Sequence, residues 1–161
     1  ARFQPKLMEY VKNGGTVIVQ YVTPSSGFLR NEPPLPPLGP YPFTIGRERV
    51  TEEDANMTFV NPQHPLLNTP NKITDADFSG WVQERGLYFP IEATDARYER
   101  LVSMGDAGEA PLTTGLLIAR VGEGTYAYSP LGWYRQLEAL NAGAWRVFAN
   151  LVSLPLSEAT P

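Results

Sequence analysis

The chain contains no cysteine in its 161 residues. A thiolate is the nucleophile of cysteine enzymes and a ligand of many zinc sites, so its absence excludes thiol catalysis, disulfide bonds and thiolate metal centres. It leaves the compartment open, because cysteine-free proteins suit both reducing and oxidising environments.

Histidine and basic residues are also scarce. His64 is the only histidine, and 13 lysines and arginines face 17 aspartates and glutamates, which gives a net charge of -4. No run of lysine or arginine occurs, and this argues against a surface for the phosphate backbone of nucleic acid. We therefore expect no nucleic-acid partner.

Long hydrophobic stretches are missing as well. No apolar run approaches the roughly 20 residues that cross a bilayer, and the first ten residues, ARFQPKLMEY, lack the pattern of a signal peptide. We expect no membrane span. Because the sequence starts with Ala1 and enters a helix-like segment almost at once, we expect it to be a portion of a longer chain.

The composition is that of one globular domain over 1–161, with 42% apolar and 19% charged residues. The 16 prolines exceed the usual share of about 5%, and we expect them in loops. Many fall in residues 23–42, TPSSGFLRNEPPLPPLGPYP. We interpret this segment as an extended surface connection or as a proline-rich ligand for an aromatic groove of a partner.

Residues 115–154 carry the clearest structural pattern. A short apolar run over 116–119, the break Gly122-Glu123-Gly124 and the β-branched and aromatic run over 125–128 together predict a β-hairpin. From residue 137 apolar residues recur every three or four positions, which predicts a closing helix. Asn141 is placed to cap its final turns, from about Ala142.

The amino-terminal segment predicts a helix over residues 4–12, with Pro5 in its first turn, and a buried strand over residues 16–21. We interpret these two elements as half of a βαβ unit, and we expect its first strand to lie outside this sequence. We therefore expect the strand to have an open edge that pairs with another chain or with the accessory region.

Residues 43–104 alternate short strand-like runs with turns. Strands are expected at 43–51, 57–61, 87–91 and 98–104, the first two forming a hairpin or small sheet. Thr74, with Asp77 three residues on, predicts a capped helical turn that carries apolar side chains.

The order of glycine turn, strand and closing helix resembles the end of a class I glutamine amidotransferase-like domain. Together with KLMEYVKNGGTVIVQY, LGPYPFTIGRERVT, HPLLNTPNKITDADFSGWVQERGLYFP and RVFANLVSL, it resembles the amidotransferase-like C-terminal region of some bacterial PIG-L-type deacetylases over nearly the whole chain. The resemblance implies an α/β fold: a partial flavodoxin-like sheet, flanking helices and an accessory β region at about 43–104. It also favours a periplasmic or secreted location over a cytoplasmic one.

The catalytic residues of the two families that the chain resembles, the PIG-L-type deacetylases and the class I amidotransferases, are missing from this sequence. A PIG-L-type deacetylase is expected to present a His-Pro-Asp-Asp motif to zinc, whereas His64 is followed by Pro65 and Leu66, so we interpret it as a loop or packing residue. A class I amidotransferase uses a cysteine with a late His and Glu, and residues 129–135 here read SPLGWYR. The resemblance thus implies a fold without the triad, no cofactor and no metal.

Other catalytic patterns are weak. Ser25, Ser26 and Ser129 lack the flanking glycines of a nucleophile elbow, and the 122–124 glycine turn lacks the lysine of a phosphate loop. A carboxylate-pair hydrolase requires two carboxyl groups that face each other, and a solvated acidic face explains the same residues. The candidate carboxylates are Asp75, Asp77, Glu84, Glu92, Asp95 and Glu99.

Aromatic residues with a basic neighbour form the candidate binding site. Aromatic faces stack on sugar rings or anchor interfaces, and packing at the edge of the core is the competing interpretation. Arg47, Arg49 and Arg85 are candidates for binding a carboxylate, although ion pairs or solvent contacts also account for them. The candidate site comprises Trp81, Tyr88, Trp133, Tyr134 and Arg135.

These features predict a non-catalytic accessory domain of a PIG-L-type N-acetyl sugar deacetylase, serving in substrate positioning, domain docking or oligomer contact. The expected partners are the deacetylase domain of the same parent chain or further copies of this chain, together with a carbohydrate. One alternative is a stand-alone carbohydrate-binding module that uses Trp81, Trp133 and Tyr134. The other is a hydrolase with an unrecognised carboxylate pair.

Overall fold

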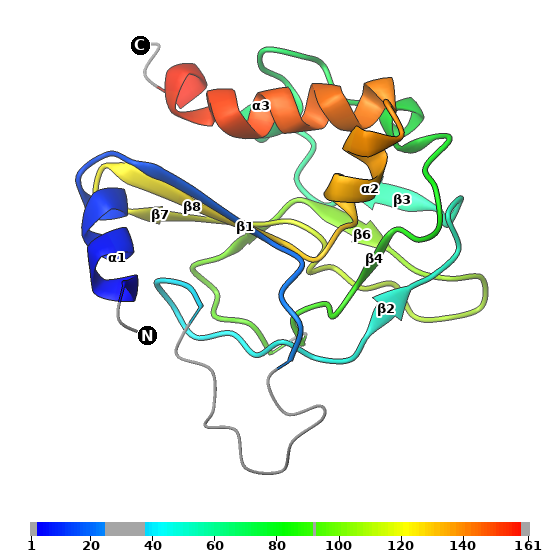
Figure 1. Cartoon of the computed structure of the whole chain (residues 1–161), viewed down its shortest axis with the longest axis horizontal. Helices are drawn as coiled ribbons and strands as arrows, with labels where there is room; N and C mark the ends of the chain where they lie inside the picture. Colours follow the sequence, from blue (N-terminus) through cyan, green and yellow to red (C-terminus); the bar gives the residue numbers. More distant parts are fainter. Residues whose placement is uncertain (1–2, 25–37, 92, 159–161) are drawn as a thin grey trace.

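A computed structural model describes residues 3–24, 38–91 and 93–158 (Figure 1). Ser25, Ser26, Glu92 and most of the proline-rich segment lie outside the described residues, so the two interpretations of that segment stay open. The main elements are α1 (Gln4–Lys12), β1 (Thr16–Gln20), β5 (Glu99–Arg100), β7 (Leu117–Val121), β8 (Gly124–Ser129), α2 (Trp133–Glu138) and α3 (Ala142–Glu158).

The central sheet has four strands in the order β1-β8-β7-β5. β1 pairs in parallel with β8, and the other two pairings are antiparallel, so the sheet is mixed. The predicted α/β class, the amino-terminal helix and strand, and the hairpin of β7 and β8 are all confirmed.

Both faces of the sheet are covered, and alternation along the strands sends neighbouring side chains into two different cores. Ile18 of β1 packs in the cluster that contains Ala144, Val147 and Leu151 of α3. Val17 packs in the cluster that contains Val11 of α1. Figure 1 accordingly shows α1 and α3 on opposite sides of the sheet.

Glycine is required where α1 meets the hairpin. Gly122 has φ +62°, a backbone conformation that suits glycine, and Glu123 N donates to Lys12 O at 3.1 Å. A Cβ on Gly124 would overlap the carbonyl oxygens of Val11 and Gly15. The glycine turn is therefore an ordinary hairpin turn onto which the end of α1 is packed.

β1 is half-buried along its whole length, not buried as predicted. The reason is its position: it ends the sheet, and one of its edges has no paired strand in the described part of the chain. The accessory strands do not cover that edge, because they pair among themselves.

The accessory region does not form the predicted hairpin of its first two strands. β2 (Arg49–Val50) instead pairs with β4 (Gly86–Leu87), and β3 (Met57–Phe59) pairs with β6 (Val102–Met104). The predicted strand at 98–104 is divided between two sheets, because β5 joins β7 while β6 joins β3. Local sequence pattern does not specify such long-range pairings.

Side chains tie the accessory region together. The Asp106 carboxylate accepts hydrogen bonds from the backbone N–H groups of Thr51 and Glu52 at 2.8 to 3.0 Å. Thr74 precedes the short 3-10 helix η2 (Asp75–Phe78), and its N–H donates to Asp77 Oδ2 at 2.8 Å, which confirms the capped turn. η2 is in turn bonded to α3, because Arg146 Nε lies 2.8 Å from Asp77 Oδ1.

The closing helical region consists of two helices. Leu140 has φ +55° and separates α2 from α3. Asn141 then caps α3 as predicted, because its side-chain Oδ1 accepts from Ala144 N at 3.0 Å. The apolar spacing at Leu137 and Leu140 thus belongs to a shorter, separate helix and the turn behind it.

Candidate functional site

The candidate site lies at the carboxyl ends of the parallel strands β1 and β8. Tyr21 directly follows β1, and its N–H still donates to Ser129 O at the end of β8 at 2.9 Å. In α/β sheets, ligands bind outside the carboxyl ends of parallel strands. Loops that follow these two strands are therefore the first place to look for a binding surface.

A third segment, residues 82–88, is fixed beside these strand ends. The buried amide of Gln136 in α2 accepts from Val82 N at 2.9 Å and donates to Val82 O at 3.0 Å. Gly86 forms a bridge with Leu131, and a Cβ on Gly86 would meet Pro130 O at 2.6 Å. This close approach requires glycine and brings Glu84 within hydrogen-bonding distance of Arg135 in α2.

Five side chains converge here, and we refer to them as the tyrosine cluster: Tyr21, Glu84, Tyr88, Tyr134 and Arg135. The Tyr21 hydroxyl donates to Glu84 Oε1 at 3.1 Å, and Arg135 Nε donates to the same oxygen at 2.9 Å. The ring of Tyr21 is edge-on to Tyr134 and Tyr88, with centroids 5.2 and 6.0 Å apart. The Arg135 guanidinium lies 4.9 Å from the centre of the Tyr134 ring.

Backbone strain concentrates around this cluster. Tyr21, Gln83 and Tyr88 have φ of 52°, 69° and 61°, in the left-handed region that non-glycine residues rarely adopt. Such a residue costs of order 1–3 kcal/mol, and residues of this kind gather at ligand sites and switches. The positions of both tyrosine rings are thus specified by the surrounding packing.

The charges of the cluster are balanced internally. Burial raises the pKa of the Tyr21 hydroxyl well above its ordinary value, against the opposing effect of Arg135, so the hydroxyl remains a donor at neutral pH. Tyr21 and then Glu84 raise the pKa of the Arg135 guanidinium. The surface therefore offers aromatic faces, tyrosine hydroxyls and an ion pair without net charge, a combination that suits a neutral, hydroxyl-rich ligand.

The structure brings together only part of the sequence-predicted site. Tyr88, Tyr134 and Arg135 belong to the tyrosine cluster, and Tyr134 is 38% exposed. Trp81 and Trp133 are 3% and 1% exposed, and their rings pack edge-on against each other at 5.0 Å in the core. For these two tryptophans the geometry supports the packing interpretation.

Sequence reasoning assigned Tyr21 to no site, and it named Glu84 only among the candidate carboxylates of a hydrolase. Tyr21 carries a usable signal, since it is the last residue of the strand predicted at 16–21, and ligand sites occur at the carboxyl ends of parallel strands. Glu84 carries no sequence signal for this site beyond its charge. It lies 63 residues from Tyr21 along the chain, and the bridge between Gly86 and Leu131 positions it.

Ser129 has a structural role. It is 1% exposed, and its hydroxyl donates to Gly115 O at 2.9 Å. The same oxygen accepts from Trp133 Nε1 at 2.9 Å and from Leu131 N at 3.3 Å. Ser129 at the end of β8 is thus a buried serine that orients a core tryptophan.

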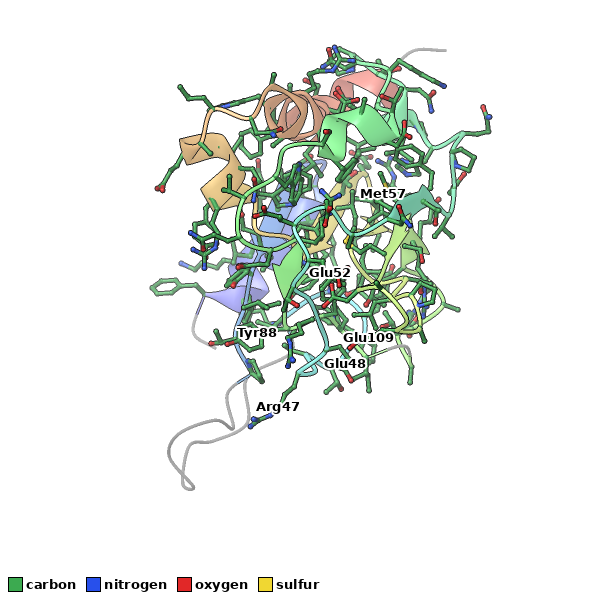
Figure 2. The ribbon with its side chains drawn as sticks, turned by 90° about the vertical axis from the view of Figure 1, so that its right-hand side faces the viewer. Arg47, Glu48, Glu52, Met57, Tyr88 and Glu109 are labelled. Carbon is green, nitrogen blue, oxygen red and sulfur yellow. The ribbon has the colours of Figure 1, made fainter. Side chains whose placement is uncertain are left out.

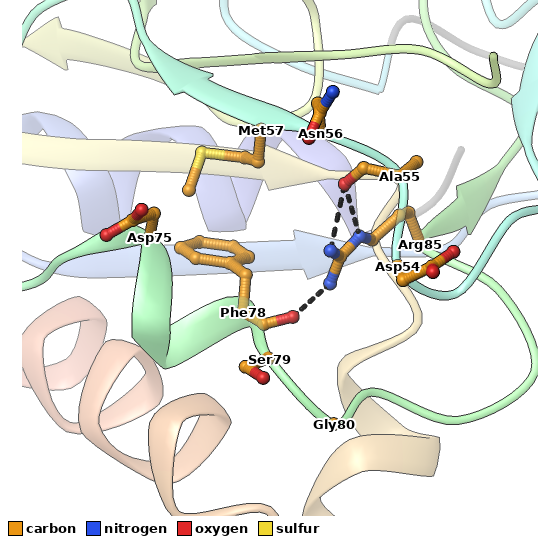
Figure 3. A pocket seen from close by; sticks show the side chains of 9 residues that line it. All are labelled: Asp54, Ala55, Asn56, Met57, Asp75, Phe78, Ser79, Gly80 and Arg85. Carbon is orange, nitrogen blue, oxygen red and sulfur yellow. Dashed lines mark hydrogen bonds between the residues drawn. The ribbon is translucent and has the colours of Figure 1, made fainter.

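A separate cavity of about 240 Å³ lies between β3 and η2 (Figure 3). Arg85 is 4% exposed at its wall, where it donates to Ala55 O and Phe78 O, and burial lowers the pKa of its guanidinium. Its donors point to backbone carbonyls, so Arg85 holds the two walls of the cavity together. Polar side chains at the mouth come from Asp54, Asn56, Asp75 and Ser79.

The three candidate arginines do not converge. Arg85 is buried, whereas Arg47 and Arg49 are exposed. Figure 2 shows Arg47 on a face that also carries Glu48, Glu52 and Glu109. Arg47 and Arg49 are therefore solvated surface residues, and the three arginines do not form a clamp for a carboxylate.

Three of the six candidate carboxylates have separate arginine partners. Asp77 binds Arg146 and Glu84 binds Arg135, with oxygen to nitrogen distances of 2.8 and 2.9 Å. Asp95 likewise binds its neighbour in the sequence, Arg97, at 2.8 Å. Partners of this kind give no support to a carboxylate-pair hydrolase.

His64 is 5% exposed and caps the short 3-10 helix η1 (Pro65–Leu67), because its Nδ1 accepts from Leu66 N at 3.1 Å. Within residues 3–24, 38–91 and 93–158, no group of three or more His, Asp or Glu side chains is arranged to hold a metal ion.

No protein-family model, curated protein or solved structure matches this chain significantly. Among the helices that the structure describes, none combines the length and apolar character needed to cross a membrane.

Proposed function

We propose that the chain is a non-catalytic accessory domain that positions a sugar through the tyrosine cluster. In this proposal the mixed sheet is a partial flavodoxin-like, amidotransferase-like sheet, and the domain serves a PIG-L-type N-acetyl sugar deacetylase, either within the same parent chain or as an assembled partner. The single observation that carries the proposal is the convergence of three tyrosines and an Arg135–Glu84 pair at the carboxyl end of β1.

The chemistry of the cluster supports a carbohydrate. Aromatic rings cover the apolar face of a sugar, and hydroxyl and guanidinium groups donate to its oxygens. Tyr134 is the exposed ring, at 38%, and Arg135 lies over it, so these two residues offer the accessible part of the site. Because Glu84 is already engaged by Tyr21 and Arg135, it orients donors instead of acting as an acid or base.

Calorimetric titration with a panel of N-acetylated and plain oligosaccharides tests this function. We expect saturable binding that weakens at least tenfold, about 1.4 kcal/mol, in Tyr134→Ala. Trp145→Ala is the matched control, since Trp145 is an exposed aromatic residue, 47% accessible, on a different helix. Equal loss in both variants, or no binding to any sugar, contradicts the assignment of the site.

A parallel assay tests the non-catalytic part of the proposal. The chain alone is incubated with N-acetylated sugars, and the release of acetate is measured. We expect none, since the sequence lacks both the thiol nucleophile and a His-Pro-Asp-Asp motif. Acetate release by the purified chain would overturn the accessory role even if the tyrosine cluster binds sugar.

A further inference from the structure

The free edge of β1 presents unprotected backbone groups. Tyr21 N donates to Ser129 O, and Thr125 N donates to Gly15 O, so the backbone groups at odd positions of the strand point toward β8. By alternation, the N–H and C=O groups of Thr16, Ile18 and Gln20 point away from the sheet. No strand of the described part of the chain pairs with them.

The sequence of β1 itself carries none of the residues that protect natural edge strands. Edges are usually blocked by charged residues, proline or a bulge. β1 reads TVIVQ, with three consecutive β-branched apolar residues and no charge or proline. Beside it, Phe3, Leu7 and Tyr10 of the α1 segment are 65%, 47% and 56% exposed.

Two polar side-chain atoms on the same strand are left without partners. Thr16 Oγ1 and Gln20 Oε1 are buried, and neither has a hydrogen-bond partner among the described residues. Both side chains lie on the face of the sheet that Ile18 shares with α3. A buried acceptor without a partner costs roughly 1–3 kcal/mol, so an arrangement that satisfies both atoms is favoured.

We propose that β1 pairs antiparallel with β1 of a second copy of this chain about a two-fold axis at Ile18. This register makes Ile18 face Ile18 and uses the outward backbone groups of both strands. It also places Thr16 of each copy opposite Gln20 of the other, so that rotation of these two side chains out of their buried positions toward the joined edge lets the Thr16 hydroxyl donate to Gln20 Oε1. One hydrogen bond satisfies both partnerless atoms, and the two sheets become one continuous sheet.

The absence of cysteine makes a register-specific test possible. In the proposed pairing, Val17 of one copy faces Val19 of the other as a non-hydrogen-bonded pair, with Cα atoms about 4.5 Å apart, within the range that a disulfide spans. Two copies of Val17, or two of Val19, are diagonal neighbours at about 7–8 Å, beyond that range.

The experiment mixes the single variants Val17→Cys and Val19→Cys under mild oxidation and resolves the products on a non-reducing gel. We expect a covalent dimer from the mixture, none from either variant alone, and its loss on reduction. A mixture that yields no more cross-linked dimer than the separate variants would overturn the proposed register.

Sedimentation equilibrium of the unmodified chain tests the association itself. We expect the unmodified chain to have the mass of a dimer. The variant Gln20→Lys should have the mass of a monomer, because it places an unpaired charge in the joined edge. Gln63→Lys makes the same charge change at an exposed turn and should remain dimeric. A folded, unmodified chain that sediments as a monomer up to near-millimolar concentration would contradict the proposal, as would equal dissociation of both lysine variants.

Discussion

Replacing Ser129 by alanine tests whether this buried residue is structural. The change removes one donor and one acceptor from a site that is 1% exposed. It leaves Gly115 O without its donor, and Trp133 Nε1 and Leu131 N without their acceptor. Each buried group left unsatisfied costs roughly 1–3 kcal/mol, and local relaxation recovers part of this, so we expect a loss of about 3 kcal/mol in the free energy of unfolding.

Urea denaturation followed by far-UV circular dichroism measures this loss. With a slope of roughly 2 kcal/mol per molar urea, the midpoint should fall by about 1.5 M. The control is Ser79→Ala at an exposed position, for which we expect a change within about 0.5 kcal/mol.

A double-mutant cycle separates the hydrogen bond from the general effect of substitution. Trp133→Phe removes the indole donor, so Ser129→Ala should cost about 1–2 kcal/mol less in that background than in the unmodified chain. A loss below about 0.5 kcal/mol for Ser129→Ala, or fully additive losses in the cycle, would refute the reasoning.

Three further substitutions probe the frame around the site. Asp106→Asn should destabilise the chain by about 1–3 kcal/mol at neutral pH, because the carboxylate binds two loop amides. Those amides lower the pKa of Asp106 against the opposing effect of burial. In urea titrations, the difference in stability between the variant and the unmodified chain should therefore shrink as the pH falls below about 4. Gly124→Ala should cost at least about 2 kcal/mol in thermal unfolding, since its Cβ would overlap Val11 O. Asn141→Ala should cost at least about 1 kcal/mol by loss of the cap, measured by the same melts. Asn141→Asp keeps the cap but loses the hydrogen bonds that Nδ2 donates to Ser79 O and Gly80 O, so it should recover only part of that stability.

Local patterns in the sequence were sufficient where a structure depends on near neighbours. The helix of residues 4–12, the hairpin at Gly122 and the cap at Asn141 all follow from spacing, turn chemistry or a single side chain. Each involves contacts within a few residues, and these are the contacts that periodicity and capping rules describe.

Long-range pairing is where the sequence-based predictions were wrong. The pattern at 57–61 correctly indicated a strand, which the structure has at 57–59, yet its partner is 102–104 and not its neighbour along the chain. A strand of two or three residues carries too few side chains to specify a partner, so tertiary packing decides the pairing.

The candidate site was predicted only in part, because it too depends on contacts between segments that are far apart in the chain. Tyr88, Tyr134 and Arg135 were singled out, but Tyr21, whose ring lies between the two other tyrosines, comes from a segment far away in the chain and was not. The left-handed backbone of Tyr21 and Tyr88 is invisible in the sequence, because only glycine or asparagine would indicate it. Trp133 was chosen by type, although its place in the core depends on Ser129.

The most direct measurement of the central claim is a ¹⁵N-edited NMR titration of the full chain with N-acetylated oligosaccharides, read through the backbone amides. Binding at the tyrosine cluster predicts that the largest shift changes centre on Tyr21, Glu84, Tyr134 and Arg135 and saturate together. Changes centred on the cavity beside Arg85, or no changes at any sugar concentration, would contradict the account.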